Sequence, residues 1–379
     1  MDLDFIGNVL LLSGINIGVS ILGLSFSVVF SILFARTISK PLVHFSKEIK
    51  NISKLEVNRG VKLESIILEV RDLVEAFEVM KTTLRSFMKF LPRKLIADLV
   101  AKGVELKLGG TMQPAITIFF ADIEDFTSWS EIMDPSFLIY QLSEYFHVIS
   151  EEITKEKGTL DKYIGDAVMS FWGAPTSMND SAVRGCRAAI RCQERLEELR
   201  KKWAQEKKPE MKCRIGIHFG PCIIGNIGSK YRLNYTAIGD NVNLSSRLEG
   251  LNKVYGTVIL ISSEVLFQPE VVSSFHVRQI DRVGVKGKLK ATVIYELICM
   301  KDSTLSEMHA KKISITELYQ QGLFAYYEKE FELASRMMKS CLDIHPVDVA
   351  SKVMYERCCT FQQYPPPDDW DGVHRFYTK

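Results

Sequence analysis

The chain has 379 residues, which is enough for two or three folded units. Its 48 basic and 46 acidic residues nearly balance and do not gather into the basic face typical of nucleic-acid binding, so we expect no nucleic-acid partner. The eight cysteines lie between Cys186 and Cys359 without the paired short spacings of zinc sites, and we expect reduced, buried thiols of a cytosolic domain.

The first predicted element is a transmembrane helix over residues 5–35. No charged residue occurs between Asp4 and Arg36, and about 20 apolar residues are enough to cross the hydrocarbon core of a bilayer. A signal peptide is the alternative, but it would carry basic residues before a shorter apolar run, whereas Asp2 precedes this one. The span is followed by basic residues, which predicts a single-pass protein with its C-terminal bulk in the cytoplasm; these are Arg36, Lys40, Lys47 and Lys50.

Residues 36–91 are predicted to form two short helices joined by a polar connector. Apolar residues recur at steps of three and four from Leu42 to Ile52, and again from Val70 to Leu91. This 3.5-residue period favours coiled-coil packing. With Pro41 at its start, the segment resembles a HAMP signal-relay module; a plain coiled-coil stalk is the alternative. Both interpretations predict a parallel dimer.

Residues 92–300 are predicted to form an α+β domain. Strand-like runs occur at 115–122, 214–219, 222–227, 257–261 and 293–298, and residues 159–172 predict a hairpin that turns at Gly165 and Asp166. Amphipathic helices are predicted at 134–154, 180–207 and 241–251. This mixture fits an α+β sandwich better than a doubly wound parallel sheet.

Residues 301–379 are predicted to form a helical tail. Gly322, Tyr326, Phe331 and Ala334, with Pro346 after the second helix, resemble one tetratricopeptide-like helical hairpin. Such a unit normally needs stacked neighbours, so we expect the tail to pack on the preceding domain or on its dimer mate.

Two carboxylates are candidate ligands for a metal ion. Asp122 ends the buried apolar strand, where a bare charge is costly, and Asp166 lies at the tip of the predicted hairpin. Two such groups suit a hard cation such as Mg²⁺ that is bound jointly with phosphates. For each residue alone, an ordinary N-cap or turn aspartate is the alternative.

The start of one predicted helix and one face of another are candidates for binding phosphate groups. Phe126 and Thr127 are predicted to open a helix, whose free amides offer an anion site. Asn243 and Arg247 are four residues apart on one predicted helix and therefore share a face. An arginine there is suited to stabilising charge that develops on a phosphate in a transition state. The alternative for Arg247 is a surface ion pair with Glu249 or another acidic residue.

Four runs in order along the chain resemble the class III adenylyl and guanylyl cyclase domain, from about Ala115 to Leu297: FFADIEDFTSWSE, DKYIGDAVMSFWGAP, IGIHFGPCIIGNIG and NYTAIGDNVNLSSRLE. The resemblance implies a ferredoxin-like α/β sandwich that uses two Mg²⁺ or Mn²⁺ ions per active site. It also implies specific roles: metal binding by Asp122, Asp166 and the Ile123 carbonyl, ribose orientation by Asn243, α-phosphate stabilisation by Arg247, and triphosphate contact by Lys286.

The same resemblance assigns Lys162 and Thr236 to reading the nucleotide base. A lysine can donate to an adenine ring nitrogen and a threonine can accept from the exocyclic amine, so this pair implies ATP as the substrate and cyclic AMP as the product. A guanylyl cyclase, which Lys162 argues against, and a catalytically silent relay that uses the fold to dimerise are the alternatives.

The resemblance also implies a head-to-tail homodimer. In the family, one subunit supplies the aspartates and the other supplies Lys162, Thr236, Asn243 and Arg247, so that each active site is composite. Two positions depart from the pattern of many members: Asp125 stands where glycine is common, and Pro221 stands where some carry a phosphate-binding arginine.

Overall fold

The computed structural model describes residues 2–52, 67–88, 96, 108–284 and 291–376. The chain divides into two compact units, Met1–Leu106 and Lys107–Lys379, and each is described by itself.

The first unit begins with a long apolar helix. α1 (Asp2–Phe34) continues through a π-helical turn (Ala35–Ser39) into α2 (Lys40–Ile52). Phe5–Lys50 is long and apolar enough to cross a membrane, with a mean hydropathy of 2.3 in its most apolar stretch, none of which is buried within the chain. By length and composition, this helix matches the predicted span.

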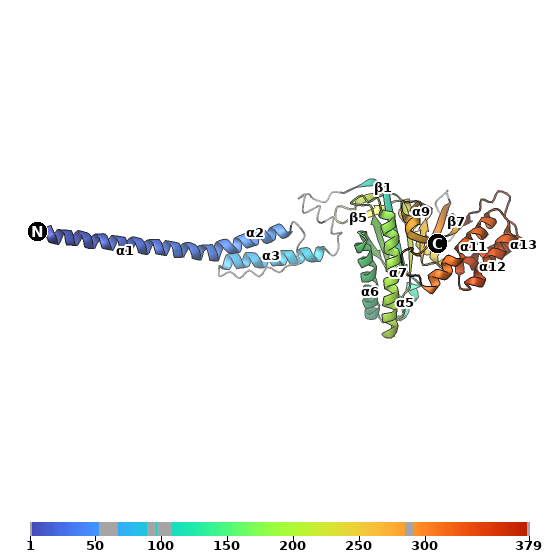
Figure 1. Cartoon of the computed structure of the whole chain (residues 1–379), viewed down its shortest axis with the longest axis horizontal. Helices are drawn as coiled ribbons and strands as arrows, with labels where there is room; N and C mark the ends of the chain where they lie inside the picture. The colour runs from blue at the N-terminus through green and yellow to red at the C-terminus, as the bar shows by residue number, and fades with distance from the viewer. Residues whose placement is uncertain (1, 53–66, 89–95, 97–107, 285–290, 377–379) are drawn as a thin grey trace. The chain divides into compact units, whose positions relative to one another are not determined.

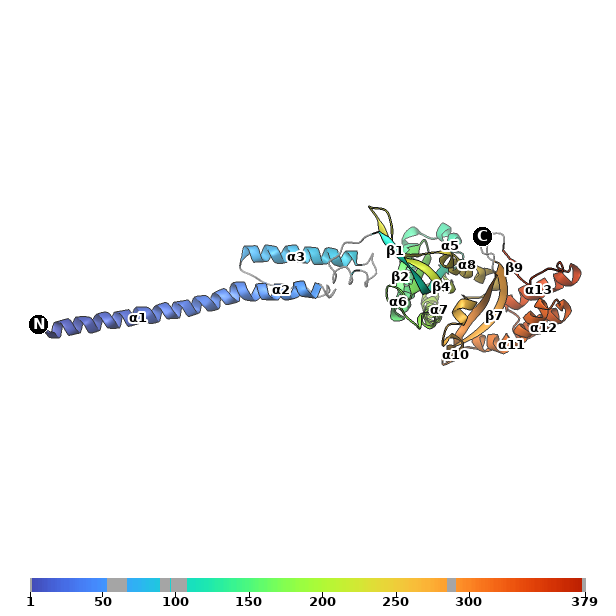
Figure 2. The same cartoon turned by 90° about the horizontal axis from the view of Figure 1, so that it is seen from above.

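α3 (Leu68–Phe87) lies alongside α2 (Figure 1, Figure 2). The rings of Phe45 and Phe77 meet edge to face with their centroids 4.8 Å apart. The connector predicted between these helices lies largely outside the described residues. The paired helices agree with the expected helix–connector–helix arrangement.

The second unit is built on a mixed sheet with the strand order β2-β3-β1-β4-β6-β8-β7-β9, with β5 pairing on β4. The β4–β6 and β7–β9 pairs are parallel, and the remaining pairs are antiparallel. The strands are β1 (Gly109–Ile123), β2 (Thr159–Ile164), β3 (Ala167–Trp172), β4 (Cys213–Gly228), β5 (Leu233–Ile238), β6 (Ile259–Ser262), β7 (Phe275–Gly284), β8 (Thr292–Met300) and β9 (His374–Arg375). This topology confirms the predicted α+β class.

Helices cover both faces of the sheet because its central strands are apolar on both sides. In β1, Phe119 and Ala121 pack against one pair of helices, whereas Ile118 and Phe120 face the opposite side. The first face is covered by α6 (Pro135–Lys155) and α7 (Ser181–Gln205), and α8 (Asp240–Tyr255) packs on the other. The shorter helices are α5 (Phe126–Ile132), α9 (Ser263–Leu266) and α10 (Val271–Ser274).

The predicted break at Gly220 and Pro221 is wrong, because β4 runs unbroken through both residues. The pairing of β4 with β1 shifts register between Gln113 and Ile116, so that Pro221 lies opposite the irregular part of β1. A proline lacks the amide that a regular ladder needs, and this irregularity accommodates it. Sequence patterning also failed to predict β5 and β7.

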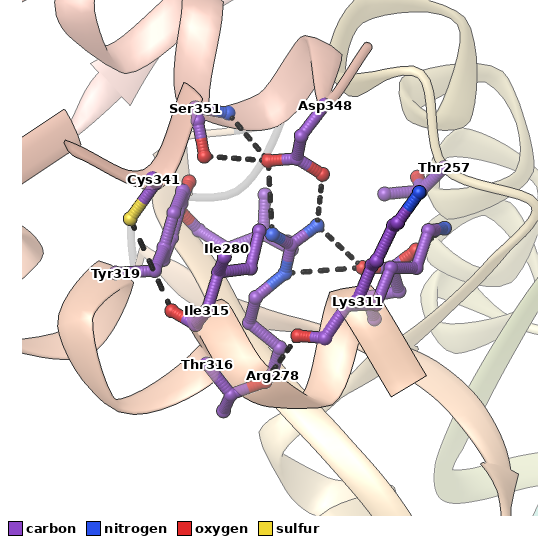
Figure 3. A network of polar contacts seen from close by, with 12 residues as sticks. Thr257, Arg278, Ile280, Lys311, Ile315, Thr316, Tyr319, Cys341, Asp348 and Ser351 are labelled. Carbon is purple, nitrogen blue, oxygen red and sulfur yellow. Dashed lines mark hydrogen bonds and ion pairs between the residues drawn. The ribbon is translucent and has the colours of Figure 1, made fainter. Parts of the chain in front are cut away.

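The tail contains three helices, one more than the predicted hairpin: α11 (Glu307–Tyr327), α12 (Phe331–Ile344) and α13 (Val349–Gln363). These helices share one apolar core with α8 and with strands β6 to β8 of the same chain. A buried polar cluster fastens this contact: Arg278 of β7 bonds to Asp348 at the start of α13, as Figure 3 shows. The tail is therefore a structural part of the second unit.

The eight cysteines are all unpaired, and seven of them are buried. Burial raises the pKa of the Cys186 thiol above its usual range. Burial is confirmed for these seven cysteines, whereas Cys359 is partly exposed.

Candidate active site

The fold brings Asp122 and Asp166 together at one end of the sheet. β1 and β3 are antiparallel neighbours, so the turn before β3 lies beside the end of β1, and the Ile123 amide donates to Asp166 Oδ2 over 3.2 Å. Gly165 takes the turn with a left-handed φ of 65°, which glycine adopts without steric cost. The two aspartates predicted as a pair are therefore neighbours.

The environment of Asp122 disfavours a second negative charge. Burial, a hydrogen bond with the carboxyl group of Asp166 and the nearby charges of Asp166 and Glu249 raise the pKa of Asp122 to about 8, although Arg214 opposes them. A divalent cation would relieve this repulsion, and carboxylate oxygens are the ligands that Mg²⁺ prefers. Among the described residues, no cluster of three acidic, histidine or cysteine side chains forms a complete metal cage. Two carboxylates supply only part of the ligands of a Mg²⁺ ion, so the pair fits an ion that is also bound by a phosphate or water.

Sequence reasoning missed the ion pair that lies behind these aspartates. Arg214 is the register partner of Asp122 on β4, and its Nε lies 3.3 Å from Glu249 Oε1. Burial raises the pKa of Glu249 to about 7, with Arg214 lowering it and Asp166 raising it further. Glu249, which the sequence offered as one possible ion-pair partner of Arg247, therefore pairs with Arg214.

Asn243 and Arg247 share one face of α8, as predicted, and this helix is fixed closely to the sheet. A side chain at Gly216 of β4 would place its Cβ 2.2 Å from the backbone nitrogen of Glu249, so glycine permits the close approach. Ser245 Oγ lies 3.0 Å from the carbonyl oxygens of both Ile118 and Gly216. These contacts set where Asn243 and Arg247 project.

The start of α8 is held by a second buried contact. His218 of β4 has Nδ1 2.7 Å from Ser262 Oγ and Nε2 3.0 Å from Asn241 Oδ1, while Asn241 donates to the Pro221 carbonyl over 2.8 Å. At Pro221, where some cyclases carry a phosphate-binding arginine, this chain therefore uses the backbone carbonyl to hold the start of α8.

The structure brings the two base-reading candidates into direct contact. Lys162 Nζ lies 3.0 Å from Thr236 Oγ1, although the residues come from β2 and β5. A residue that sequence analysis did not single out joins them: Asp161 accepts from Thr236 Oγ1 over 2.6 Å and lies 3.4 Å from Lys162 Nζ. Within the described chain, no hydrogen bond or ion pair links either of these residues to Asp122 or Asp166. The lysine–threonine pair and the carboxylate pair are separate clusters of one chain.

The residues that follow β1 agree only in part with the predicted phosphate site. Phe126 begins α5 as predicted, and its side chain packs against the core, which leaves its backbone for any phosphate contact. Asp125 adopts a left-handed φ of 52°, and its carboxylate lies 3.2 Å from Lys253 Nζ of α8. Thr127 is exposed in the first turn. Lys286 lies outside the described residues.

A mixed α+β sheet with a paired carboxylate centre, a lysine–threonine pair and an asparagine–arginine helix face defines a nucleotide cyclase catalytic domain. The model of the Adenylate and Guanylate cyclase catalytic domain family matches residues 111–298. Residues 111–298 therefore form a catalytic domain of the class III adenylyl and guanylyl cyclase family.

Two curated relatives carry adenylate cyclase names. Adenylate cyclase 1 of Rhizobium meliloti (strain 1021) is 34% identical over 275 residues, which cover 72% of this chain and 40% of the relative. The adenylate cyclase of Anabaena cylindrica is 34% identical over 250 residues, which cover 63% of this chain and 49% of the relative. The chain thus spans less than half the length of either relative.

A solved bacterial light-regulated adenylyl cyclase has the same fold, with a TM-score of 0.55 at 20% identity over 67% of this chain and 71% of that chain.

Proposed function

We propose that this chain is an adenylate cyclase that converts ATP to 3′,5′-cyclic AMP and pyrophosphate in signal transduction. The observation that carries the choice of ATP is the contact between Lys162 and Thr236, a donor and a hydroxyl set side by side. Lysine donates to an adenine ring nitrogen and threonine accepts from the amine. The adenylate cyclase names of the two relatives support the same choice.

Asp122, Asp166 and the Ile123 carbonyl would hold two divalent ions, Mg²⁺ or Mn²⁺. Such ions lower the pKa of the ribose 3′-hydroxyl and neutralise the departing pyrophosphate. The raised pKa of Asp122 supports this role, since the neighbouring carboxylates repel one another without a cation.

The other proposed residues bind and orient the nucleotide. Asn243 holds the ribose so that its 3′-oxygen attacks the α-phosphate in line, and Arg247 stabilises the charge that grows on that phosphate. Lys286 and the start of α5 at Phe126 and Thr127 contact the triphosphate. No protein nucleophile is needed, because the attacking group belongs to the substrate.

The active unit proposed here is a homodimer with two composite sites. The carboxylate pair of one subunit meets the base-reading pair and the α8 face of the other. An exposed apolar seam on α3 supports a dimeric stalk: Leu73, Met80 and Phe87, at seven-residue steps, are 45%, 52% and 61% exposed. We propose that this stalk is a HAMP-like relay.

We further propose that α1 anchors the dimer as a single-pass membrane span with the catalytic unit in the cytoplasm. The apolar helix exposes nearly all of its large side chains, and Arg36, Lys40, Lys47 and Lys50 follow it.

Product analysis tests the proposal. The purified full chain is incubated with ATP or GTP and Mg²⁺ or Mn²⁺, with Arg247→Ala as the inactive control. Cyclic AMP from wild type, at a rate well above the cyclic GTP rate, is the expected result. Mainly cyclic GTP would identify a guanylate cyclase, and no cyclic nucleotide from a folded dimer would favour the silent relay.

A further inference from the structure

Asp161 lies at a bulge in β2, immediately before the base-reading Lys162. The pairing of β2 with β3 shifts register between Leu160 and Lys162, so that Asp161 has no partner residue of its own on β3. A bulge changes the direction of a side chain relative to regular alternation. Here the Asp161 side chain is fully buried and reaches β5, where its Oδ2 accepts from Thr236 Oγ1 over 2.6 Å and from the Ala237 amide over 3.3 Å.

The hydrogen bonds around Thr236 determine which way its hydroxyl proton points. A threonine hydroxyl has one proton to donate and can also accept, whereas an ionised carboxylate only accepts. The other acceptor within reach of the hydroxyl, the Ala237 carbonyl, is 3.5 Å away, so the charge-assisted 2.6 Å bond to Asp161 takes the proton. Lys162 Nζ, 3.0 Å from the same oxygen, can only donate to it. Thr236 is therefore left with acceptor capacity alone.

This polarity distinguishes the two purines. Adenine presents an amine donor at its 6-position, and guanine presents a carbonyl acceptor there. A hydroxyl that is free to rotate could serve either base, because it would donate to guanine as readily as it accepts from adenine. A hydroxyl that already donates its proton to a carboxylate can offer only a lone pair to the guanine carbonyl. The hydroxyl oxygen and the carbonyl oxygen then have no hydrogen bond between them, which is costly in a buried site.

We propose that Asp161 is a specificity-determining residue, which makes the cyclase select ATP over GTP by holding Thr236 as a pure hydrogen-bond acceptor. Asp161 is a positioning residue that acts through Thr236, without touching the base. The inference rests on the proposed assignment of Lys162 and Thr236 to base reading.

The decisive variant is Asp161→Asn, which keeps the size of the side chain and removes the negative charge that makes the bond from Thr236 strong. The Thr236 proton is then held only by a neutral amide oxygen and can turn towards a guanine carbonyl. We expect the ratio of kcat/KM for ATP to that for GTP to fall by about tenfold or more in the full chain, with the loss on ATP and not on GTP. An equal loss on both substrates would show a merely structural role and overturn the proposal.

Two further variants separate polarity from packing. Asp161→Glu keeps an acceptor-only group, and we expect it to retain more of the ATP preference than Asp161→Asn, even if its longer side chain lowers both rates. In a Thr236→Val background, Asp161→Asn should no longer change the ratio, because the hydroxyl it acts through is gone. Equal loss of preference in both Asp161 variants, or an unchanged effect of Asp161→Asn without the Thr236 hydroxyl, would refute the mechanism.

A binding measurement keeps this test separate from the proposed catalysis. The relative Kd of non-hydrolysable ATP and GTP analogues is measured for wild type and Asp161→Asn, with thermal unfolding as the check on folding. In one outcome, wild type makes no cyclic nucleotide and still prefers the ATP analogue, with Asp161→Asn abolishing that preference. This result would reject the proposed activity but support the role of Asp161 in base selection. A wild-type chain with no preference between the analogues would overturn the inference itself.

Discussion

Arg278 of β7 donates two hydrogen bonds of 2.9 Å each to the two carboxylate oxygens of Asp348, the residue that caps α13. Both side chains are buried, and Figure 3 shows them facing each other. Nε and Nη2 of Arg278 also donate to Glu296 of β8, which in turn pairs with Lys312 of α11. Two cations thus neutralise two carboxylates at the contact between the sheet and the tail. Burying charges is costly, so this arrangement is stable only while every member is present.

Removing Arg278 should therefore loosen the tail. In Arg278→Ala, Glu296 and Asp348 lose a buried partner, and we expect the free energy of unfolding to fall by about 3–5 kcal/mol. Denaturant unfolding of the full chain, followed by tryptophan fluorescence, measures this change. Arg336→Ala is the matched control, since its partner Glu332 and Arg336 itself are largely exposed. A near-wild-type stability for Arg278→Ala would contradict the importance of the cluster.

Acid should weaken the same contact. Burial opposes ionisation of Asp348 and Glu296, but Arg278, together with Lys312 at Glu296, lowers both pKa values below their ordinary values of 3.8 and 4.5. Each group binds its proton more readily when unfolded, so its stabilisation is complete above the ordinary pKa and is lost as the pH falls through the lower, folded value.

We expect the contribution of Asp348 and Glu296 to the free energy of unfolding to be nearly constant between about pH 5 and 7 and to fall below about pH 4.5. Asp348→Asn should be less stable at pH 7 and should show a shallower fall. If this variant and wild type lose stability in parallel on acidification, the cluster does not carry the effect.

Two glycines, one inside α8 and one at its C-terminal end, give a matched pair of substitutions. Gly256 ends the helix with a φ of 62°, and a Cβ there would lie 2.4 Å from the Cβ of Val349 in α13. Gly250 lies inside the helix with open space around it. Gly256→Ala should lower the free energy of unfolding by more than about 1 kcal/mol, while Gly250→Ala should raise it by about 0.5–1 kcal/mol. Equal effects would show that the tail tolerates a displaced α8 end.

Complementation tests the composite site. Asp122→Ala and Arg247→Ala should each be inactive alone, because each removes an essential group from both sites of the homodimer. A mixture of the two contains heterodimers with one site whose residues are all intact, so about half of the activity per heterodimer should return. Cyclic AMP formation by co-purified heterodimers is the measurement. Heterodimers of verified composition that stay inactive would refute a site shared between subunits.

The apolar seam of α3 predicts where the stalk joins its second copy. Met80→Glu places a charge in that seam and should shift the chain from dimer to monomer and lower cyclase activity accordingly. Thr83→Glu, an exposed position beside the seam, is the control and should leave both unchanged. Sedimentation in detergent measures the oligomeric state, and cyclic AMP assays measure the activity. If Met80→Glu remains fully dimeric, the dimer interface does not include this seam.

Local patterns in the sequence were sufficient to predict the apolar helix, the hairpin turn at Gly165 and Asp166, and the face shared by Asn243 and Arg247. Each depends on residues a few positions apart, where hydrophobic period and turn chemistry act directly. The motif resemblance added Lys162 and Thr236 to the candidate site.

Other features depend on residues far apart in the sequence, so only the tertiary structure decided them. Strand β4 continues through Pro221 because an irregularity in β1 lies opposite it. Arg214 pairs with Glu249, and Asp161 binds Thr236 across 75 positions, because strand pairing and helix packing bring them together. The sequence determined which groups could carry out the chemistry; burial and hydrogen-bond partners decided how each of them is charged and oriented.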